Sequence, residues 1–128
     1  MSGATTNITR VGTVIVPVSD QDRALEFYVG KLGFEKRIDG PFGEGQRWIE
    51  VAPPGAATTI ALCAAPQGEA AGIEVSLATE DADADHANLL AQGVEADEEV
   101  MRMGDYVPPM FTFRDPDGNR FRMVERDD

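Results

Sequence analysis

The sequence predicts an α+β protein built from two copies of one small unit, and two features support this. Residues 11–18, VGTVIVPV, form an apolar β-branched run that leads into an acidic helix start, and residues 72–94, GIEVSLATEDADADHANLLAQGV, repeat that order. The second half of each unit repeats as well, as a strand, a turn rich in Gly and Pro, and another strand. A period of about 60 residues is too long for a solenoid and indicates two copies of one fold unit.

In the first unit, a helix is expected to begin near Ser19 to Asp22, where the Ser-x-x-Asp spacing resembles a capping box, and to end at Gly33. Its apolar stripe consists of Ala24, Leu25, Tyr28 and Leu32. Strands are expected over Trp48 to Ala52 and Thr59 to Ala64. The Gly and Pro content of residues 39–47 and 53–58 predicts loops.

In the second unit, the helix is expected to end at Gly93, and its stripe consists of Ala82, His86, Leu89 and Leu90. Two strands, Met110 to Arg114 and Phe121 to Glu125, flank a turn around Asp115-Pro116-Asp117-Gly118. Residues 95–109 form an irregular segment, either a hinged lid or, as we favour, a plain surface connection. Each unit therefore has the order β, α, then two or three further strands.

The faces of the last strand indicate where a site can lie. Side chains alternate along a strand, so Phe121 and Met123 share one face while Arg122 and Val124 share the other. One helix covers only one face of a sheet, so the opposite faces must meet each other, meet a partner chain, or enclose a cavity. Arg122 is therefore expected to line an interior.

Composition excludes several classes of function. The net charge of −12 argues against nucleic acid or an anionic membrane as a partner. Cys63 is the only cysteine, so no intrachain disulfide can form. No apolar run approaches the roughly 20 residues that span a bilayer, and MSGATTN lacks the apolar region of a signal peptide, so a cytoplasmic location is expected.

The segment VSDQDRALEFYVGKLGF, the internal repeat and the closing FRDPDGNRFRMVE together resemble the vicinal oxygen chelate superfamily of glyoxalase I, extradiol dioxygenases and bleomycin resistance proteins. The resemblance implies one domain over residues 1–128, made of two βαβββ modules at about 8–66 and 72–126 that curl into a cup-shaped mixed sheet. It also implies a homodimer whose cup holds the active or binding site. The cup could be formed within one chain or shared between two.

Metal-dependent members carry ligands on the first and last strand of each module, and the resemblance places Thr13, Ala61, Glu74 and Arg122 at these positions. Only Glu74 is a competent ligand, because a guanidinium has no lone pair to offer a cation. We therefore expect no metal and no other cofactor. Arg122 is expected to form a bidentate pair with Glu74 in the space of the metal, which we favour over a free Arg122 that awaits an anionic substrate.

Four further residues are candidates for ligand contact. Trp48 and Tyr106 could stack on a planar or cationic compound, and Glu50 shares a strand face with Trp48. Cys63 shares a face with Ala61 and is expected to line the cup as a small apolar group rather than act as a nucleophile. The single histidine, His86, is expected to pack on its helix stripe rather than catalyse a reaction.

The favoured function is metal-free binding or sequestration of a small cationic or aromatic compound, similar to the bleomycin-resistance branch. One alternative is a glyoxalase-like lyase or a dioxygenase that depends on a divalent metal. A second is a metal-free enzyme in which Arg122 holds an anionic substrate. The sequence leaves open whether the protein is catalytic.

Overall fold

The computed structural model describes residues 6–41, 43, 45–65, 73–104 and 107–126. The first unit comprises β1 (Thr13–Val18), α1 (Gln21–Leu25), the π-helix η1 (Glu26–Lys31), β2 (Glu35–Pro41), β3 (Arg47–Ala52) and β4 (Thr59–Ala64). The second comprises β5 (Glu74–Thr79), α2 (Ala82–Ala91), β6 (Glu95–Ala96), β7 (Met110–Arg114) and β8 (Arg120–Glu125). The predicted α+β class and the repeated order of elements are confirmed.

The strands form two four-stranded mixed sheets, in the orders β1-β4-β3-β2 and β5-β8-β7-β6. In each sheet the first strand of the unit runs parallel to the last, and the remaining pairs are antiparallel. The two units therefore have the same topology. Within the described residues, the two sheets remain separate and do not close into a cup.

Each α-helix begins at an aspartate whose side chain caps the helix backbone. Asp20 accepts a hydrogen bond of 3.0 Å from the backbone N–H of Arg23, and Asp81 accepts one of 3.0 Å from that of Ala84. These caps satisfy N–H groups that a helix start leaves open. The first helix thus begins one residue later than the Ser-x-x-Asp spacing predicted.

Two details of the sequence prediction are wrong. The loop expected at residues 39–47 is shorter, because β2 continues to Pro41 and β3 begins at Arg47. An edge strand such as β2 tolerates Gly and Pro, and an ion pair of 2.9 Å from Arg47 to Asp39 holds the two strands together. In α2, Leu90 is 44% exposed, because the short helix turns Leu89 rather than Leu90 toward the core.

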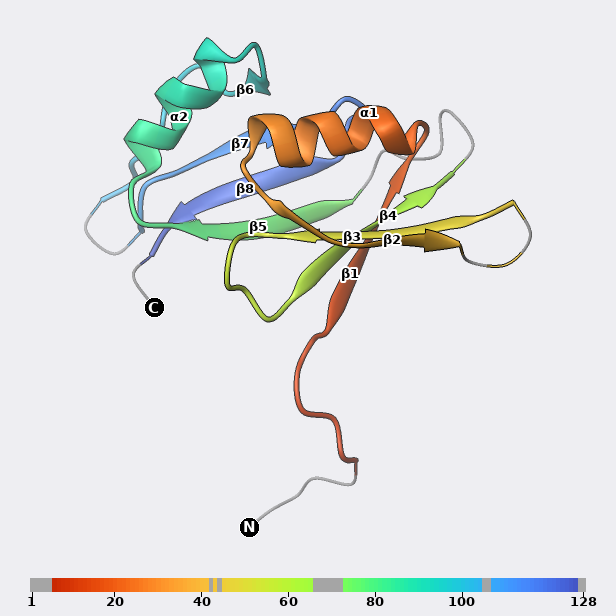
Figure 1. Cartoon of the computed structure of the whole chain (residues 1–128). Helices are drawn as coiled ribbons and strands as arrows, with labels where there is room; N and C mark the ends of the chain where they lie inside the picture. Colours follow the sequence, from red (N-terminus) through yellow and green to blue (C-terminus); the bar gives the residue numbers. More distant parts are fainter. Residues whose placement is uncertain (1–5, 42, 44, 66–72, 105–106, 127–128) are drawn as a thin grey trace.

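The core is one apolar cluster that spans both units. Aromatic side chains of the first helical segment pack directly on the second sheet, with ring centroids 6.4 Å apart for Phe27 and Phe113 and 5.7 Å apart for Tyr28 and Phe121. Both helices lie on one side of the strands, and residues 6–12 run away from the body (Figure 1). One face of each sheet is therefore buried, and the opposite face is turned outward.

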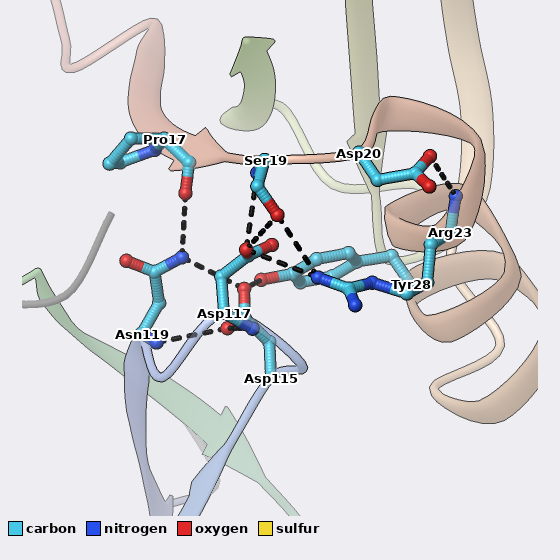
Figure 2. A network of polar contacts seen from close by, with 8 residues as sticks. All are labelled: Pro17, Ser19, Asp20, Arg23, Tyr28, Asp115, Asp117 and Asn119. Atoms are coloured by element: carbon cyan, nitrogen blue, oxygen red, sulfur yellow. Dashed lines mark hydrogen bonds and ion pairs between the residues drawn. The ribbon is translucent and has the colours of Figure 1, made fainter. Parts of the chain in front are cut away.

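The turn between β7 and β8 connects the two units through polar contacts (Figure 2). Asp117 Oδ1 accepts hydrogen bonds from the backbone N–H and the hydroxyl of Ser19, at 3.1 and 2.5 Å, and forms an ion pair of 3.2 Å with Arg23. The Asn119 amide donates to the Pro17 carbonyl at 2.8 Å. The DPDGN turn, residues 115–119, therefore fixes the end of β1 in place.

No helix of the described part of the chain is long and apolar enough to span a membrane.

Candidate functional site

Most of the candidate residues in the first unit lie together on the outward face of the first sheet. Strand register pairs Thr13 with Thr59, Glu50 with Ala61, and Pro17 with Cys63, and paired residues point to the same side of a sheet. Trp48 lies two residues before Glu50 and shares this face. The opposite face carries core residues such as Val16, Ile49 and Leu62.

A chain of hydrogen bonds runs across this face from Trp48 to Thr13. The indole N–H of Trp48 donates to Glu50 Oε2 at 2.7 Å, and the hydroxyl of Thr59 donates to Glu50 Oε1 at 2.8 Å. The hydroxyls of Thr59 and Thr13 lie 2.9 Å apart. Both oxygens of the half-buried Glu50 carboxylate are therefore held in place, and the ring of Trp48 is fixed beside them.

Ala61 and Cys63 form the apolar part of the same face. Ala61 is fully buried, and Cys63 is half-buried. Burial raises the pKa of the Cys63 thiol, and the negative charge of Glu50 raises this pKa further. The thiol therefore remains protonated, which opposes a nucleophilic role.

On the outward face of the second sheet, Glu74 lies between two arginines. Its Oε1 is 3.0 Å from Nη2 of Arg120, and its Oε2 is 3.0 Å from Nη2 of Arg122. The side chains of Glu74 and Arg122 are 36% and 47% exposed. The predicted contact of Arg122 with Glu74 is present, but it is not the expected bidentate pair, because the other carboxylate oxygen contacts Arg120. In a single chain the pair lies on an open surface and not in an interior.

The geometry of the four positions implied for metal ligands does not fit a divalent cation. Ala61 has no donor atom, and the Thr13 hydroxyl is engaged with Thr59. Both oxygens of Glu74 are engaged by guanidinium groups, which also repel a cation. We therefore derive no metal-dependent step for these residues.

Two members of this arrangement were not among the candidates from the sequence. Thr59 completes the support of Glu50, and Arg120 completes that of Glu74. The alternation of side chains could have identified Thr59, because it shares a strand face with Ala61. Tyr106 lies outside the described residues.

His86 lies apart from both groups, with its Nε2 atom 2.7 Å from the Asp97 carbonyl and its ring against Phe111 at 5.0 Å. These contacts are those of a packed side chain. The segment expected to be irregular contains the two-residue strand β6 and a bridge from Met101 to Met110. Arg102 contacts Asp83 of α2 through an exposed ion pair of 2.6 Å.

Sequence comparison with known proteins finds similarity over most of the chain. A family model described as Glyoxalase/Bleomycin resistance protein/Dioxygenase superfamily matches residues 10–123. The uncharacterized protein YetH of Bacillus subtilis is 34% identical over 125 residues, which cover 92% of this chain and 99% of that protein.

Solved structures are similar over nearly the whole chain. TnmS3, an antibiotic binding protein from Streptomyces sp. CB03234, is 35% identical, with a TM-score of 0.83 and coverage of 95% of this chain and 99% of that one. A member of the glyoxalase/bleomycin resistance protein/dioxygenase superfamily from Sphaerobacter thermophilus is 37% identical, with a TM-score of 0.84 and coverage of 93% and 98%.

Proposed function

This chain belongs to the Glyoxalase/Bleomycin resistance protein/Dioxygenase superfamily, and we propose that it binds a small cationic or aromatic compound without a metal. The compound would lie on the outward face of the first sheet, over Trp48 and Glu50. The antibiotic binding protein TnmS3, which shares this fold at 35% identity, supports a binding role over a catalytic one. We therefore propose that the function of the chain is to sequester this compound.

The observation that carries the proposal is the fixed carboxylate of Glu50. Hydrogen bonds from Trp48 and Thr59 hold both of its oxygens, so the negative charge and the adjacent indole are oriented before any ligand arrives. Preorganised groups bind more tightly because less motion is lost on association. A planar cation would meet an aromatic surface and a carboxylate at once.

A second copy of the chain would complete the cup. The outward face of the first sheet carries Glu50, whereas that of the second sheet carries Arg120 and Arg122 around one carboxylate, an excess of one positive charge. A homodimer that sets the second sheet of one copy opposite the first sheet of the other would join faces of opposite charge. The exposed apolar side chain of Ile15, 56% accessible, would then be covered.

The excess charge on the second sheet also supports one other function. Two guanidinium groups share a single carboxylate, so Arg122 retains donors for an anionic group of a bound molecule. A metal-free enzyme could use them to hold a substrate carboxylate or a developing oxyanion.

Metal content and melting temperature test the metal-free proposal. Protein purified without an affinity tag should contain no stoichiometric metal, and Ni²⁺, Zn²⁺, Mn²⁺ and Fe²⁺ should leave its melting temperature unchanged. A tightly bound metal at one equivalent that raises the melting temperature would refute it.

Ligand binding can be followed by the fluorescence of Trp48, the only tryptophan. Aromatic cations should quench this fluorescence saturably, and Glu50→Gln should weaken binding about tenfold or more, because a desolvated charge pair is lost. Glu26→Gln is a matched control, since Glu26 is exposed on η1, among the helices that cover the buried side of the sheets. Equal affinity in the Glu50→Gln protein would contradict the site, and turnover of an anionic compound that requires Arg122 would favour the second function.

A further inference from the structure

A cleft between the two units lies on the helix side of the sheets, away from the outward faces. It has a volume of about 230 Å³. Its floor is apolar and comes from both units, namely Leu32, Phe34, Leu77, Leu89, Phe113 and Met123. None of these six belongs to the candidate site described above.

The internal repeat explains why the floor of this cleft is apolar. At the corresponding corner of the molecule, where the β7–β8 turn meets the end of β1, the Tyr28 hydroxyl donates to Asp115 and the Asn119 amide to the Pro17 carbonyl. A hollow of about 190 Å³ lies beside these contacts, and its lining includes the polar side chains of Glu95, Arg114 and Asp115. Counted from the two N-caps, Leu89 holds in α2 the place of Tyr28. The residue after β3 is Pro53, where the residue after β7 is Asp115.

The first-unit turn thus lacks the side chains that bridge the other corner. A leucine is smaller than a tyrosine and has no hydroxyl, and the side chain of a proline has no acceptor atom such as the carboxylate of aspartate. Leu32, Phe34, Leu77 and Met123 consequently remain only partly buried. Apolar surface left accessible in a concave site favours an apolar ligand.

The rim of the cleft carries two hydrogen-bond donors at exposed positions. Lys31 and Asn88 line it from opposite units. The Asn88 oxygen accepts a hydrogen bond of 2.8 Å from Gln92, whereas the Asn88 amide nitrogen and the Lys31 ammonium have no hydrogen-bond partner among the residues that the structure describes. The Asp85 carboxylate is also on the rim and accepts a hydrogen bond from the Thr79 hydroxyl, which does not neutralise it, so Lys31 is the rim residue that would attract an anion.

We propose that this cleft is a second binding site, for a small amphipathic carboxylate. The apolar body would cover the floor between α2 and the second sheet, and the carboxylate would accept hydrogen bonds from Lys31 and Asn88. A volume below the roughly 300 Å³ at which pockets for drug-sized ligands begin favours a short chain or a single ring. This site is separate from the Trp48 and Glu50 face, so either proposal can fail alone.

The test uses octanoate as the probe and octanol as its uncharged analogue, with binding followed by methyl NMR. Octanoate should shift the methyl signals of Leu32, Leu77, Leu89 and Met123 saturably, with a dissociation constant of roughly 1 mM. Octanol should bind several-fold more weakly. Lys31→Gln should abolish the preference for octanoate.

A filling variant separates the cleft from the other site. Asn88→Trp places a large ring in the cleft from an exposed position of α2 and should weaken octanoate binding about tenfold, while Glu50→Gln should leave it unchanged. Circular dichroism and the melting temperature verify that Asn88→Trp and Glu50→Gln fold. If Asn88→Trp does not fold, Lys31→Glu provides a second test of the cleft. Methyl shifts on the outward face instead, unchanged affinity in both cleft variants, or dissociation of a dimer by octanoate would overturn the proposal.

Discussion

The phenolic hydroxyl of Tyr28 donates a hydrogen bond of 2.6 Å to Oδ2 of Asp115, and this contact joins the first helical segment to the β7–β8 turn (Figure 2). Tyr28 is fully buried, and Asp115 is 5% exposed. Asp115 also accepts hydrogen bonds of 2.9 Å from the backbone N–H groups of Asp117 and Asn119. One carboxylate therefore shapes the turn and attaches it to the other unit.

Tyr28→Phe should lower the free energy of unfolding by about 1.5–3 kcal/mol, because a hydrogen bond to a charged acceptor is lost in a buried place. Chemical denaturation at neutral pH measures this. Ser19→Ala is the matched control and should lose less, because the Asp117 carboxylate keeps the Ser19 backbone N–H and Arg23 as donors. A loss below about 0.5 kcal/mol for Tyr28→Phe would show that the contact does not hold the units together.

The same tyrosine predicts a dependence of stability on alkaline pH. Burial raises the pKa of Tyr28 well above its usual range, and the adjacent Asp115 carboxylate raises it further. The folded protein keeps this proton, whereas the unfolded chain releases it near pH 10, so stability should fall as the pH rises above about 10. This fall should be smaller in Tyr28→Phe, as measured by urea unfolding between pH 8 and 11.

The sequence predicted the repeated order of elements and the strand faces, because both depend on local patterns of apolar residues. It placed Trp48 and Glu50 on one face and paired Glu74 with Arg122. It could not predict how much of that pair is exposed, because exposure depends on how the sheets are arranged. Likewise, no local pattern shows that Phe27 of the first unit packs on Phe113 of the second.

Arg122→Ala should change the free energy of unfolding of the single chain by less than about 1 kcal/mol. The pair with Glu74 is partly exposed, and surface ion pairs contribute little, whereas burial of the pair would have implied a loss of roughly 3 to 5 kcal/mol. Arg120→Ala is the matched control because Arg120 contacts the other oxygen of the same carboxylate. Denaturation at several protein concentrations measures both variants, and a larger loss that grows with concentration would show that a second copy covers Arg122.

The Glu50 network should show energetic coupling. Thr59→Val removes a buried hydroxyl that contacts both Glu50 and Thr13, so it should cost about 1–3 kcal/mol. In a double-mutant cycle with Glu50→Gln, the coupling energy should be about 0.5–3 kcal/mol. Thr58→Val is the control, because the Thr58 hydroxyl bonds to a backbone carbonyl at an exposed position. Its effect on stability should be additive with that of Glu50→Gln.

The alkylation rate of the Cys63 thiol reports the influence of the Glu50 carboxylate on this thiol. Burial raises the pKa of the thiol first, and the Glu50 carboxylate adds to the rise, so reaction of Cys63 with iodoacetamide should be slower at pH 8 than that of an exposed thiol. Glu50→Gln removes the second cause and should move the pH profile of alkylation to lower pH. Because Cys63 is the only cysteine, mass spectrometry of the intact protein measures the rate without ambiguity. Glu26→Gln should leave the profile unchanged, and an identical profile in Glu50→Gln would mean that the carboxylate does not act on the thiol.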